Sequence, residues 1–228
     1  MSLLDLTVED VRCLQRAELV LHPGRNLIWG PNGAGKTSVL EAIFLLGRGR
    51  SFRTRSSERL IRRDRDRLIV FGHSDAVPVG GIGVQISKAG GTEAKIGGAF
   101  VRSLAELARA FPVQIIDPGV HRLIEEGAGI RRRWLDWAVF HVEPGFVDNW
   151  VRYNRTLKQR NAALKSGAAD FSVWNPELIR AGEALAESRR VVLERMQPYW
   201  RDAVGASTLN FHFTGQTLVI GGDGQVTL

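Results

Sequence analysis

The segment Gly30 to Thr37 reads GPNGAGKT, and it constrains the fold more than any other part of the chain. It fits the pattern G-x-x-x-x-G-K-[ST], in which backbone N–H groups surround the phosphates of a nucleotide. Its glycines let the loop turn tightly and bring those N–H groups against phosphate oxygens. Lys36 would reach the β and γ phosphates, and Thr37 would offer its hydroxyl to Mg²⁺. The predicted nucleotide contacts are Gly30, Pro31, Asn32, Gly33, Ala34, Gly35, Lys36 and Thr37.

The flanks of this loop predict a strand before it and a helix after it. Asn26 to Trp29 is a short apolar run typical of a buried strand. Downstream, apolar residues recur at helical spacing, namely Val39, Leu40, Ile43, Phe44 and Leu46. Gly47 and Gly49 are expected to end that helix. A chance match in a glycine-rich turn would not bring this context with it, so we interpret the segment as a phosphate-binding loop.

Two further strands are expected ahead of the loop, because apolar and polar residues alternate over residues 4–8 and 17–21. Many small kinases and GTPases begin almost directly with the loop strand, whereas ABC-type ATPases place an antiparallel layer first. The order of elements favours the second group. Arg12 lies at the bend between the two strands. Its position allows two interpretations, a contact near the base or phosphates of a nucleotide, or a solvated turn arginine.

The helix is followed by nine arginines between Arg48 and Arg67. The first four have few acidic neighbours and are candidates for contact with phosphates of DNA or of the nucleotide: Arg48, Arg50, Arg53 and Arg55. The later arginines alternate with Asp64 and Asp66, which is typical of a self-paired surface. The formal charge of +7 and the pI of about 10.3 also favour an anionic partner such as nucleic acid.

Residues 68–96 contain short β-like runs joined by glycine-rich turns, which predicts an antiparallel meander. SLAELARAF predicts an amphipathic helix, and PVQIID, from Pro112 to Asp117, is a candidate buried strand. We do not interpret it as a Walker B strand. Gln114 interrupts the apolar run, no glutamate follows Asp117, and Asp117-Pro118-Gly119 is typical of a turn.

Residues 120–205 are mostly helical by pattern and form a second block. One helix is expected from about Val147 to Lys165, and its basic residues would either follow a DNA backbone or only solubilise the helix. These basic residues are Arg152, Arg155, Lys158, Arg160 and Lys165. Three tryptophans at helical spacing among apolar neighbours are expected in the core: Trp134, Trp137 and Trp150.

The remaining composition indicates a soluble cytoplasmic protein with no membrane partner. No run approaches about 18 apolar residues, and the N-terminus lacks a signal-peptide pattern. The single cysteine, Cys13, excludes an internal disulfide and fits a reducing compartment. The five histidines lack close cysteine or carboxylate partners, so the sequence gives no side-chain metal site.

Three stretches together resemble the RecF family of bacterial ATPases, which is related to the SMC and Rad50 proteins. They are GPNGAGKTSVLEAIFLLGRGRSFRT, PVQIIDPGVHRLIEEGAGIRRRWLDWAVFHVEPGF and RTLKQRNAAL. The resemblance implies an α/β fold, a P-loop NTPase of ABC-ATPase/SMC-head type with an antiparallel β layer, plus a mainly helical subdomain. The expected domains are 1–118 for the N-terminal part of the ATPase lobe, 119–205 for the helical subdomain, and 206–228 for a β-like tail that starts a return to the lobe.

The same resemblance implies ATP and Mg²⁺ as cofactors, with ATP held between two subunits of an ATP-dependent homodimer. It implies binding to single-stranded, gapped or junction DNA, and work with RecR and RecO in DNA repair, replication restart and the SOS response. By position, Gly30 to Thr37 is the ATP loop. Arg12 resembles the basic residue that related heads place near the nucleotide.

One departure from the family concerns hydrolysis. The chain ends at Leu228, before a complete family member would, and we expect it to be a truncated form or a fragment. No segment resembles the family's signature motif or a Walker B strand with its acidic pair, so no Mg²⁺ carboxylate or general base is assigned. A nucleotide- or DNA-binding fragment without hydrolysis is therefore an alternative. A P-loop small-molecule kinase is another, but the preceding strands and the helical block do not fit it.

Overall fold

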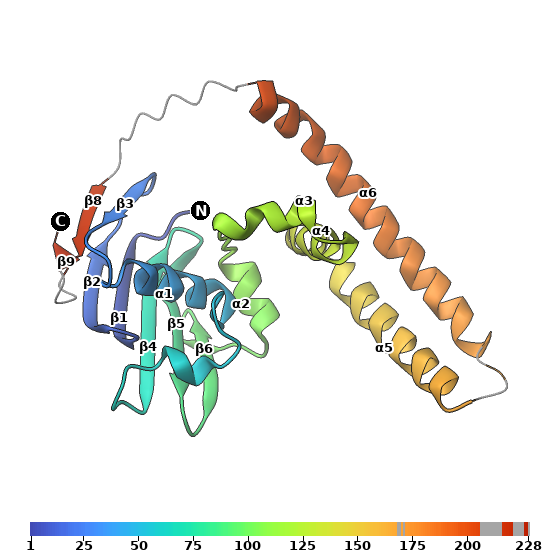
Figure 1. The fold of residues 1–228 in the computed structure, drawn as a ribbon, viewed down its shortest axis with the longest axis horizontal. Helices are drawn as coiled ribbons and strands as arrows, with labels where there is room; N and C mark the ends of the chain where they lie inside the picture. The colour runs from blue at the N-terminus through green and yellow to red at the C-terminus, as the bar shows by residue number, and fades with distance from the viewer. Residues whose placement is uncertain (168–169, 171, 206–215, 221–225, 228) are drawn as a thin grey trace. The chain divides into compact units, whose positions relative to one another are not determined.

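Two units make up the chain, Met1–Ile116 with Phe211–Leu228, and Asp117–Asn210. The structure is a computed structural model, and it describes residues 1–167, 170, 172–205, 216–220 and 226–227 (Figure 1). STLNFHF, expected to be β-like, lies outside the described residues.

The first unit contains a six-stranded antiparallel sheet in the order β2-β1-β4-β5-β6-β7. Its strands are β1 (Asp5–Val11), β2 (Leu14–Val20), β4 (Arg67–Ser74), β5 (Val77–Ser87), β6 (Gly91–Ile96) and β7 (Ala99–Phe100). Alternate residues face one side, so Val8, Val70 and Val84 all lie in the same core. The two strands predicted from alternation are confirmed, as is the meander predicted from short β-like runs.

The helices α1 (Lys36–Arg48) and α2 (Leu104–Ala110) bury their apolar residues in this core. Val39, Leu45 and Leu107 are fully buried there. Helix α1 runs through Gly47 and ends at Arg48, and Gly49, with φ 62°, donates its N–H to the Leu45 carbonyl at 2.8 Å. The prediction that Gly47 ends the helix was wrong, and its glycine is explained instead by the close approach of the Phe111 carbonyl, which leaves no room for a Cβ.

A second sheet has the order β3-β8-β9, with β3 (Asn26–Trp29), β8 (Gln216–Ile220) and β9 (Val226–Thr227). Strand β3 pairs in parallel with β8, and β9 is antiparallel to β8. The predicted strand at Asn26–Trp29 is confirmed, but its predicted burial was wrong, since Leu27 and Trp29 are exposed. The strand lies at the edge of a small sheet, and Ile28 is the residue that packs against the core.

The chain between α2 and the helical unit does not form the strand predicted for PVQIID. Among the described strands, none contains or pairs with residues 112–117, and Ile116 is 83% exposed. Without a neighbouring strand the segment has no ladder to join. The turn at Asp117 is confirmed, because its Oδ1 accepts the Gly119 N–H at 2.8 Å. This turn leads into η2 (Pro118–His121).

The second unit is helical. It contains α3 (Arg122–Glu125), α4 (Ala128–Val142), α5 (Phe146–Lys165), η3 (Ser172–Trp174) and α6 (Asn175–Gly205). The short helix η1 (Ser57–Leu60) belongs to the first unit instead. Helices α5 and α6 lie side by side (Figure 1). Their core with α4 contains Val139, Phe146, Leu185 and Val192. Arg189 on α6 donates to both Asp136 oxygens on α4, at 2.7 and 3.1 Å.

The tryptophans do not form this core. Trp134 and Trp150 are exposed, and Trp137 is half-buried and stacked on Phe140 at 5.6 Å between ring centroids. The prediction of a tryptophan core was wrong, because one layer of three helices leaves little room to enclose an indole.

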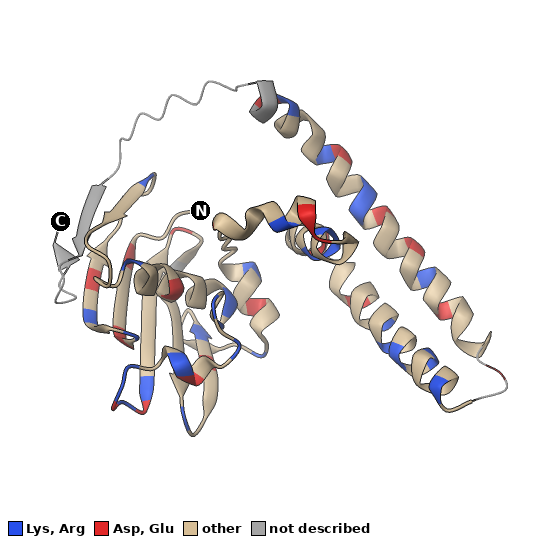
Figure 2. Ribbon diagram, in the orientation of Figure 1, with Lys and Arg blue, Asp and Glu red and all other residues tan. Residues whose placement is uncertain are grey.

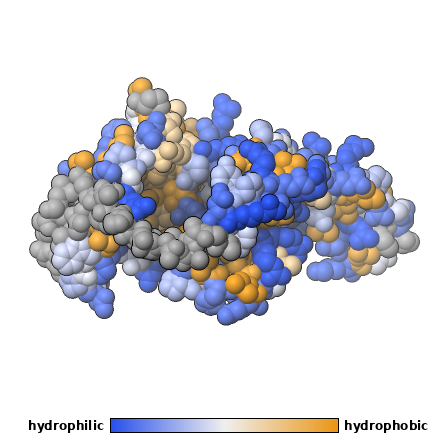
Figure 3. Space-filling model, turned by 90° about the horizontal axis from the view of Figure 1, so that it is seen from above, coloured by the Kyte–Doolittle hydropathy of each residue, from blue (hydrophilic) through white to orange (hydrophobic). Residues whose placement is uncertain are grey.

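Figure 3 shows hydrophobic residues exposed between hydrophilic ones on one face of the molecule. No helix in the described residues combines the length and apolar character needed to cross a membrane.

Candidate nucleotide-binding site

The predicted phosphate-binding loop joins β3 to the first turn of α1. All three of its glycines have backbone angles that L side chains rarely adopt, φ 150° at Gly30, φ 87° at Gly33 and φ 104° at Gly35. A Cβ on Gly33 would meet no atom within 4 Å, so the loop is open at that point. A Cβ on Gly35 would lie 2.8 Å from Leu14 Cδ2, so the base of the loop is packed tightly against the neighbouring turn.

Lys36 lies at the mouth of this loop. Its Nζ donates to the carbonyl oxygens of Gly30 and Pro31, each at 2.8 Å. Thr37 is exposed in the first turn of α1, and that turn contains no acidic residue. The helix N-terminus, an ammonium group and a hydroxyl therefore gather around one open loop, which is the arrangement that holds phosphate oxygens.

The turn between β1 and β2 packs along the same end of α1. Cys13 Sγ lies 3.5 Å from Ser38 Oγ, and Leu14 lies against Gly35. Arg12 donates from Nε and Nη2 to the two carboxylate oxygens of Glu41, both at 3.0 Å. The interpretation of Arg12 as a solvated turn arginine was therefore wrong. Its contact with a nucleotide stays a prediction.

Glu41 is the residue of this region that the sequence analysis did not single out. Its side chain is 0% exposed, although it is charged. The sequence contained one indication of its burial. Glu41 lies between Leu40 and Ala42 in the segment that was predicted to be helical from the spacing of its apolar residues. A charged residue on the buried side of a helix requires a partner, and Arg12 provides it.

The four candidate arginines, Arg48 at the end of α1 and three that follow it, occupy different environments. Arg48 is half-buried, with its guanidinium 5.6 Å from the centre of the Phe44 ring. Burial, and then the neighbouring charge of Arg50, lowers the pKa of Arg48 to about 10. Arg50, Arg53 and Arg55 are exposed, and Arg53 Nη1 lies 4.0 Å from a Glu41 oxygen. Arg48 thus lies on the helix of the nucleotide loop, and of the three arginines after that helix the structure brings Arg53 within 4.0 Å of one of its side chains.

The later arginines are partly neutralised. Arg62 and Arg65 approach Asp10 at 3.7 and 3.5 Å, and Lys88 pairs with Asp66 at 3.3 Å. This agrees with the self-paired surface predicted for that part of the chain.

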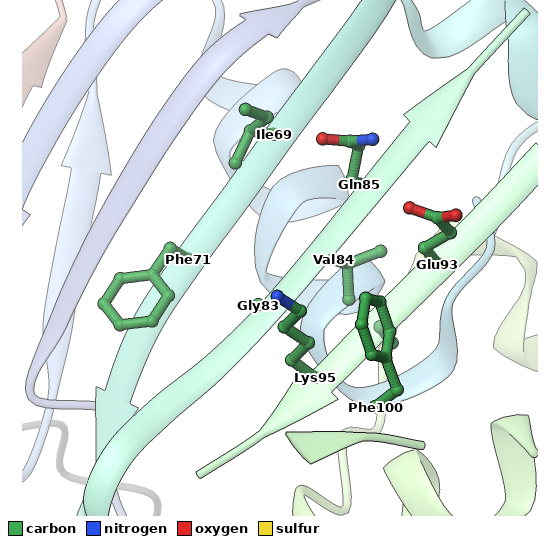
Figure 4. A pocket seen from close by; sticks show the side chains of 9 residues that line it. Ile69, Phe71, Gly83, Val84, Gln85, Glu93, Lys95 and Phe100 are labelled. Atoms are coloured by element: carbon green, nitrogen blue, oxygen red, sulfur yellow. The ribbon is translucent and has the colours of Figure 1, made fainter. Parts of the chain in front are cut away.

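An open hollow of about 220 Å³ lies on the other face of the six-stranded sheet (Figure 4). Gly83, which lacks a side chain, forms its floor, and Phe71 and Phe100 stand on either side. The Lys95 amine lies 4.4 Å from the centre of the Phe100 ring. With largely apolar walls and no glycine loop, this hollow does not have the chemistry of a phosphate site, so the candidate site is the loop before α1.

Comparison with known proteins shows which family this chain resembles. A protein-family profile described as the RecF/RecN/SMC N terminal domain matches residues 2–120. A DNA replication and repair protein RecF of Vibrio vulnificus (strain CMCP6) is 42% identical over 202 residues, which cover 86% of this chain and 56% of that protein. The RecF of Shewanella baltica (strain OS155) is 40% identical over 208 residues, covering 90% and 58%. The chain thus spans about half the length of these relatives.

Two solved structures, of the recombination mediator protein RecF with ATP and with ATPrS in the RecFOR pathway, also match, each with a TM-score of 0.71. Their sequences are 28% and 27% identical to this chain. The match covers 86% and 85% of this chain and 54% of each of those proteins.

Proposed function

The chain belongs to the RecF family within the RecF/RecN/SMC group, and from that premise we propose that it binds ATP at Gly30–Thr37 as part of a RecF-type DNA-repair ATPase. Its fold is the α/β fold of ABC-type ATPase and SMC heads. The observation that carries the proposal is the loop itself, with left-handed glycines, the helix N-terminus and the Lys36 amine at its mouth.

The residues of the loop fit a nucleotide triphosphate. Backbone N–H groups of the loop and the Lys36 amine would hold the β and γ phosphates, and Thr37 would take part in binding Mg²⁺. No cluster of three or more metal-ligating side chains occurs in the part of the chain that the structure describes. The metal would therefore be held here chiefly by phosphate oxygens, water and the Thr37 hydroxyl, which is its usual preference.

The direct test is equilibrium binding of a fluorescent, non-hydrolysable ATP analogue to this chain. We expect saturable binding that weakens by about tenfold when EDTA removes Mg²⁺. AMP lacks the phosphates that the loop holds and should compete poorly, whereas ADP should compete well. Absence of saturable binding by a chain that circular dichroism shows to be folded would contradict the proposal.

The part of the proposal that concerns DNA, partner proteins and cellular role is based on the relatives. The RecF relatives are DNA replication and repair proteins, and the solved structures place RecF in the RecFOR pathway. We therefore extend the proposal to binding of single-stranded, gapped or junction DNA, to RecR and RecO as partners, to an ATP-dependent homodimer, and to a cytoplasmic location with roles in recombination and the SOS response.

Helix α5 supplies a surface suited to DNA phosphates. It carries five basic residues and one acidic residue, whereas basic and acidic residues are balanced along α6 (Figure 2). Four of the basic residues are exposed, and in the described structure no acidic side chain pairs with any of them: Arg152, Arg155, Lys158 and Lys165. Arg160 differs, because it is half-buried and donates to Asn175. This basic stripe supports the interpretation that α5 follows a nucleic-acid backbone.

Neutralising the basic stripe should weaken DNA binding without altering the fold. The triple substitution Arg152→Gln, Arg155→Gln and Lys158→Gln is expected to lower affinity for single-stranded DNA. The slope of log K against log salt should fall by about 2, because each lost phosphate contact contributes about 0.7. Fluorescence anisotropy with a labelled oligonucleotide at several salt concentrations measures both quantities.

The matched control for that experiment is Arg190→Gln. Arg190 is an exposed arginine of the same unit, but Glu187 and Glu194 already pair with it. The Arg190→Gln variant should leave the slope of log K against log salt unchanged. If the control lowers the slope as much as the triple variant does, the effect is one of net charge and not of the basic stripe.

A second candidate function is nucleotide binding without hydrolysis. It is favoured by the state of Glu41, the acidic residue on the helix of the loop, which is buried and held by Arg12 and Ser51. That carboxylate is not placed to activate water. Measurement of phosphate release alongside analogue binding separates the two functions, since binding with no turnover supports the second candidate.

A further inference from the structure

Glu41 joins two segments of the chain to the helix of the nucleotide loop. It lies five residues after Lys36, about 7.5 Å along the helix axis, and its side chain has no exposed surface. Arg12, from the turn between β1 and β2, binds it through two hydrogen bonds of 3.0 Å. Both carboxylate oxygens therefore accept a hydrogen bond from the turn that packs on the loop.

The other partners come from the segment after α1. Ser51 Oγ donates to Glu41 Oε1 at 2.5 Å and accepts the N–H groups of Arg53 and Thr54 at 2.9 and 3.2 Å. The Arg53 guanidinium lies 4.0 Å from the second carboxylate oxygen. The conformation of residues 51–54 therefore depends on the same buried carboxylate that holds Arg12.

A buried carboxylate constrains its partners strongly. A single negative charge removed from water is tolerated when a cation and hydrogen-bond donors satisfy it, and breaking such a pair is strongly destabilising. Any ligand that draws Arg12 toward itself leaves this charge to be compensated from elsewhere. Among the described residues, Arg53 is the other cation within 4.0 Å of Glu41.

We propose that Glu41 is a positioning residue, a counter-ion shared by Arg12 and Arg53, which couples nucleotide binding at Gly30–Thr37 to the position of residues 51–54. Anions that contact the arginines after α1 then affect nucleotide affinity, and the nucleotide affects that contact by the same factor. The coupling to nucleotide rests on the proposed function, whereas the positioning of residues 51–54 by Glu41 does not.

Hydrogen exchange of the chain without ligand tests the positioning directly. In Glu41→Gln, the amides of Arg53 and Thr54 should exchange about tenfold faster or more, because the group that holds their acceptor is weakened. Amides of β4 and β5 should keep their rates. Equal acceleration at all of these amides, or no change at residues 53 and 54, would overturn the proposal, because either result means that Glu41 has no local positioning role.

A second variant and a control accompany this hydrogen-exchange experiment. Ser51→Ala removes only the bridging hydroxyl, so it should reproduce the faster exchange at Arg53 and Thr54 even if Glu41→Gln does not fold. Arg16→Gln breaks exposed pairs with Glu9 and Glu18 on the sheet, and should leave the exchange of both amides unchanged. Unchanged exchange in Ser51→Ala would overturn the proposal.

The coupling itself is tested with the ATP analogue and Mg²⁺. Saturating analogue should change exchange at Arg53 and Thr54 by about threefold or more in the natural sequence, and this change should vanish in Arg12→Gln. An analogue that binds but gives the same exchange in both chains overturns the coupling. An analogue that does not bind overturns the proposed function instead, and the ligand-free experiment then decides the positioning role.

Discussion

Lys36→Ala is expected to reduce affinity for the ATP analogue by at least about 100-fold, which corresponds to about 3 kcal/mol of binding free energy. The substitution removes the only charged side chain of the loop, and with it the cation for the β and γ phosphates. The fold should survive, because the Lys36 amine contacts the carbonyl oxygens of its own loop and no buried carboxylate. Titration with the fluorescent analogue and a thermal melt measure the two effects.

The same variant separates nucleotide binding from DNA binding. We expect salt-sensitive binding of single-stranded DNA to persist in Lys36→Ala, because the basic stripe on α5 uses other residues. Lys88→Ala is the matched control, an exposed lysine paired with Asp66 in the same unit. It should affect neither ligand. Equal loss of nucleotide and DNA binding in Lys36→Ala would refute the separation.

Gly47→Ala is expected to lower the free energy of unfolding by about 1–3 kcal/mol. A Cβ at this position would lie 2.4 Å from the Phe111 carbonyl oxygen and 2.7 Å from Val113 Cγ2. Alanine favours a helix interior over glycine by about 1 kcal/mol, so intrinsic propensity alone predicts the opposite sign. The clash should prevail, because the nearest atom belongs to the backbone and cannot rotate away. Urea unfolding monitored by circular dichroism gives the difference.

Gly129→Ala provides the comparison. Gly129 also lies in a helix, α4, but a Cβ there would meet no atom within 4 Å. This variant should be as stable as the natural sequence or slightly more stable. The explanation by close packing fails if Gly47→Ala unfolds at the same urea concentration as Gly129→Ala.

The parts of the fold that the sequence predicted are those with local causes. The phosphate-binding loop needs glycines within a few residues of one another, and its strand and helix follow at once, so Asn26–Trp29 and α1 were found from neighbouring residues. The two strands ahead of the loop were predicted from alternation, because one face of their sheet is buried, and the meander was predicted from short β-like runs between glycine-rich turns. The turn at Asp117 was likewise determined by the residue itself and the two after it.

The parts that failed depend on contacts between distant residues. Glu41 is indistinguishable from a surface residue until Arg12, 29 positions earlier, is seen to meet it. Gly47 resembles a helix terminator in the sequence, and only the position of Phe111 explains why a glycine stands there inside the helix. PVQIID has the composition of a strand, but a strand also requires a neighbour, which the described sheets do not provide. Composition carries no information about such partners.

The pairing of β3 with β8 has a consequence for the order of folding during synthesis. The strands β4 to β7 pair with one another in sequence order and β4 also pairs with β1, whereas Asn26 of β3 meets Gln216, about 190 residues later. Such distant pairings form slowly, because a long loop must close first. At about 5–20 residues per second, a ribosome needs about 10–40 s to produce the partner of β3. The antiparallel sheet can assemble on the nascent chain in that interval, so the strand that supports the nucleotide loop pairs after that sheet has formed.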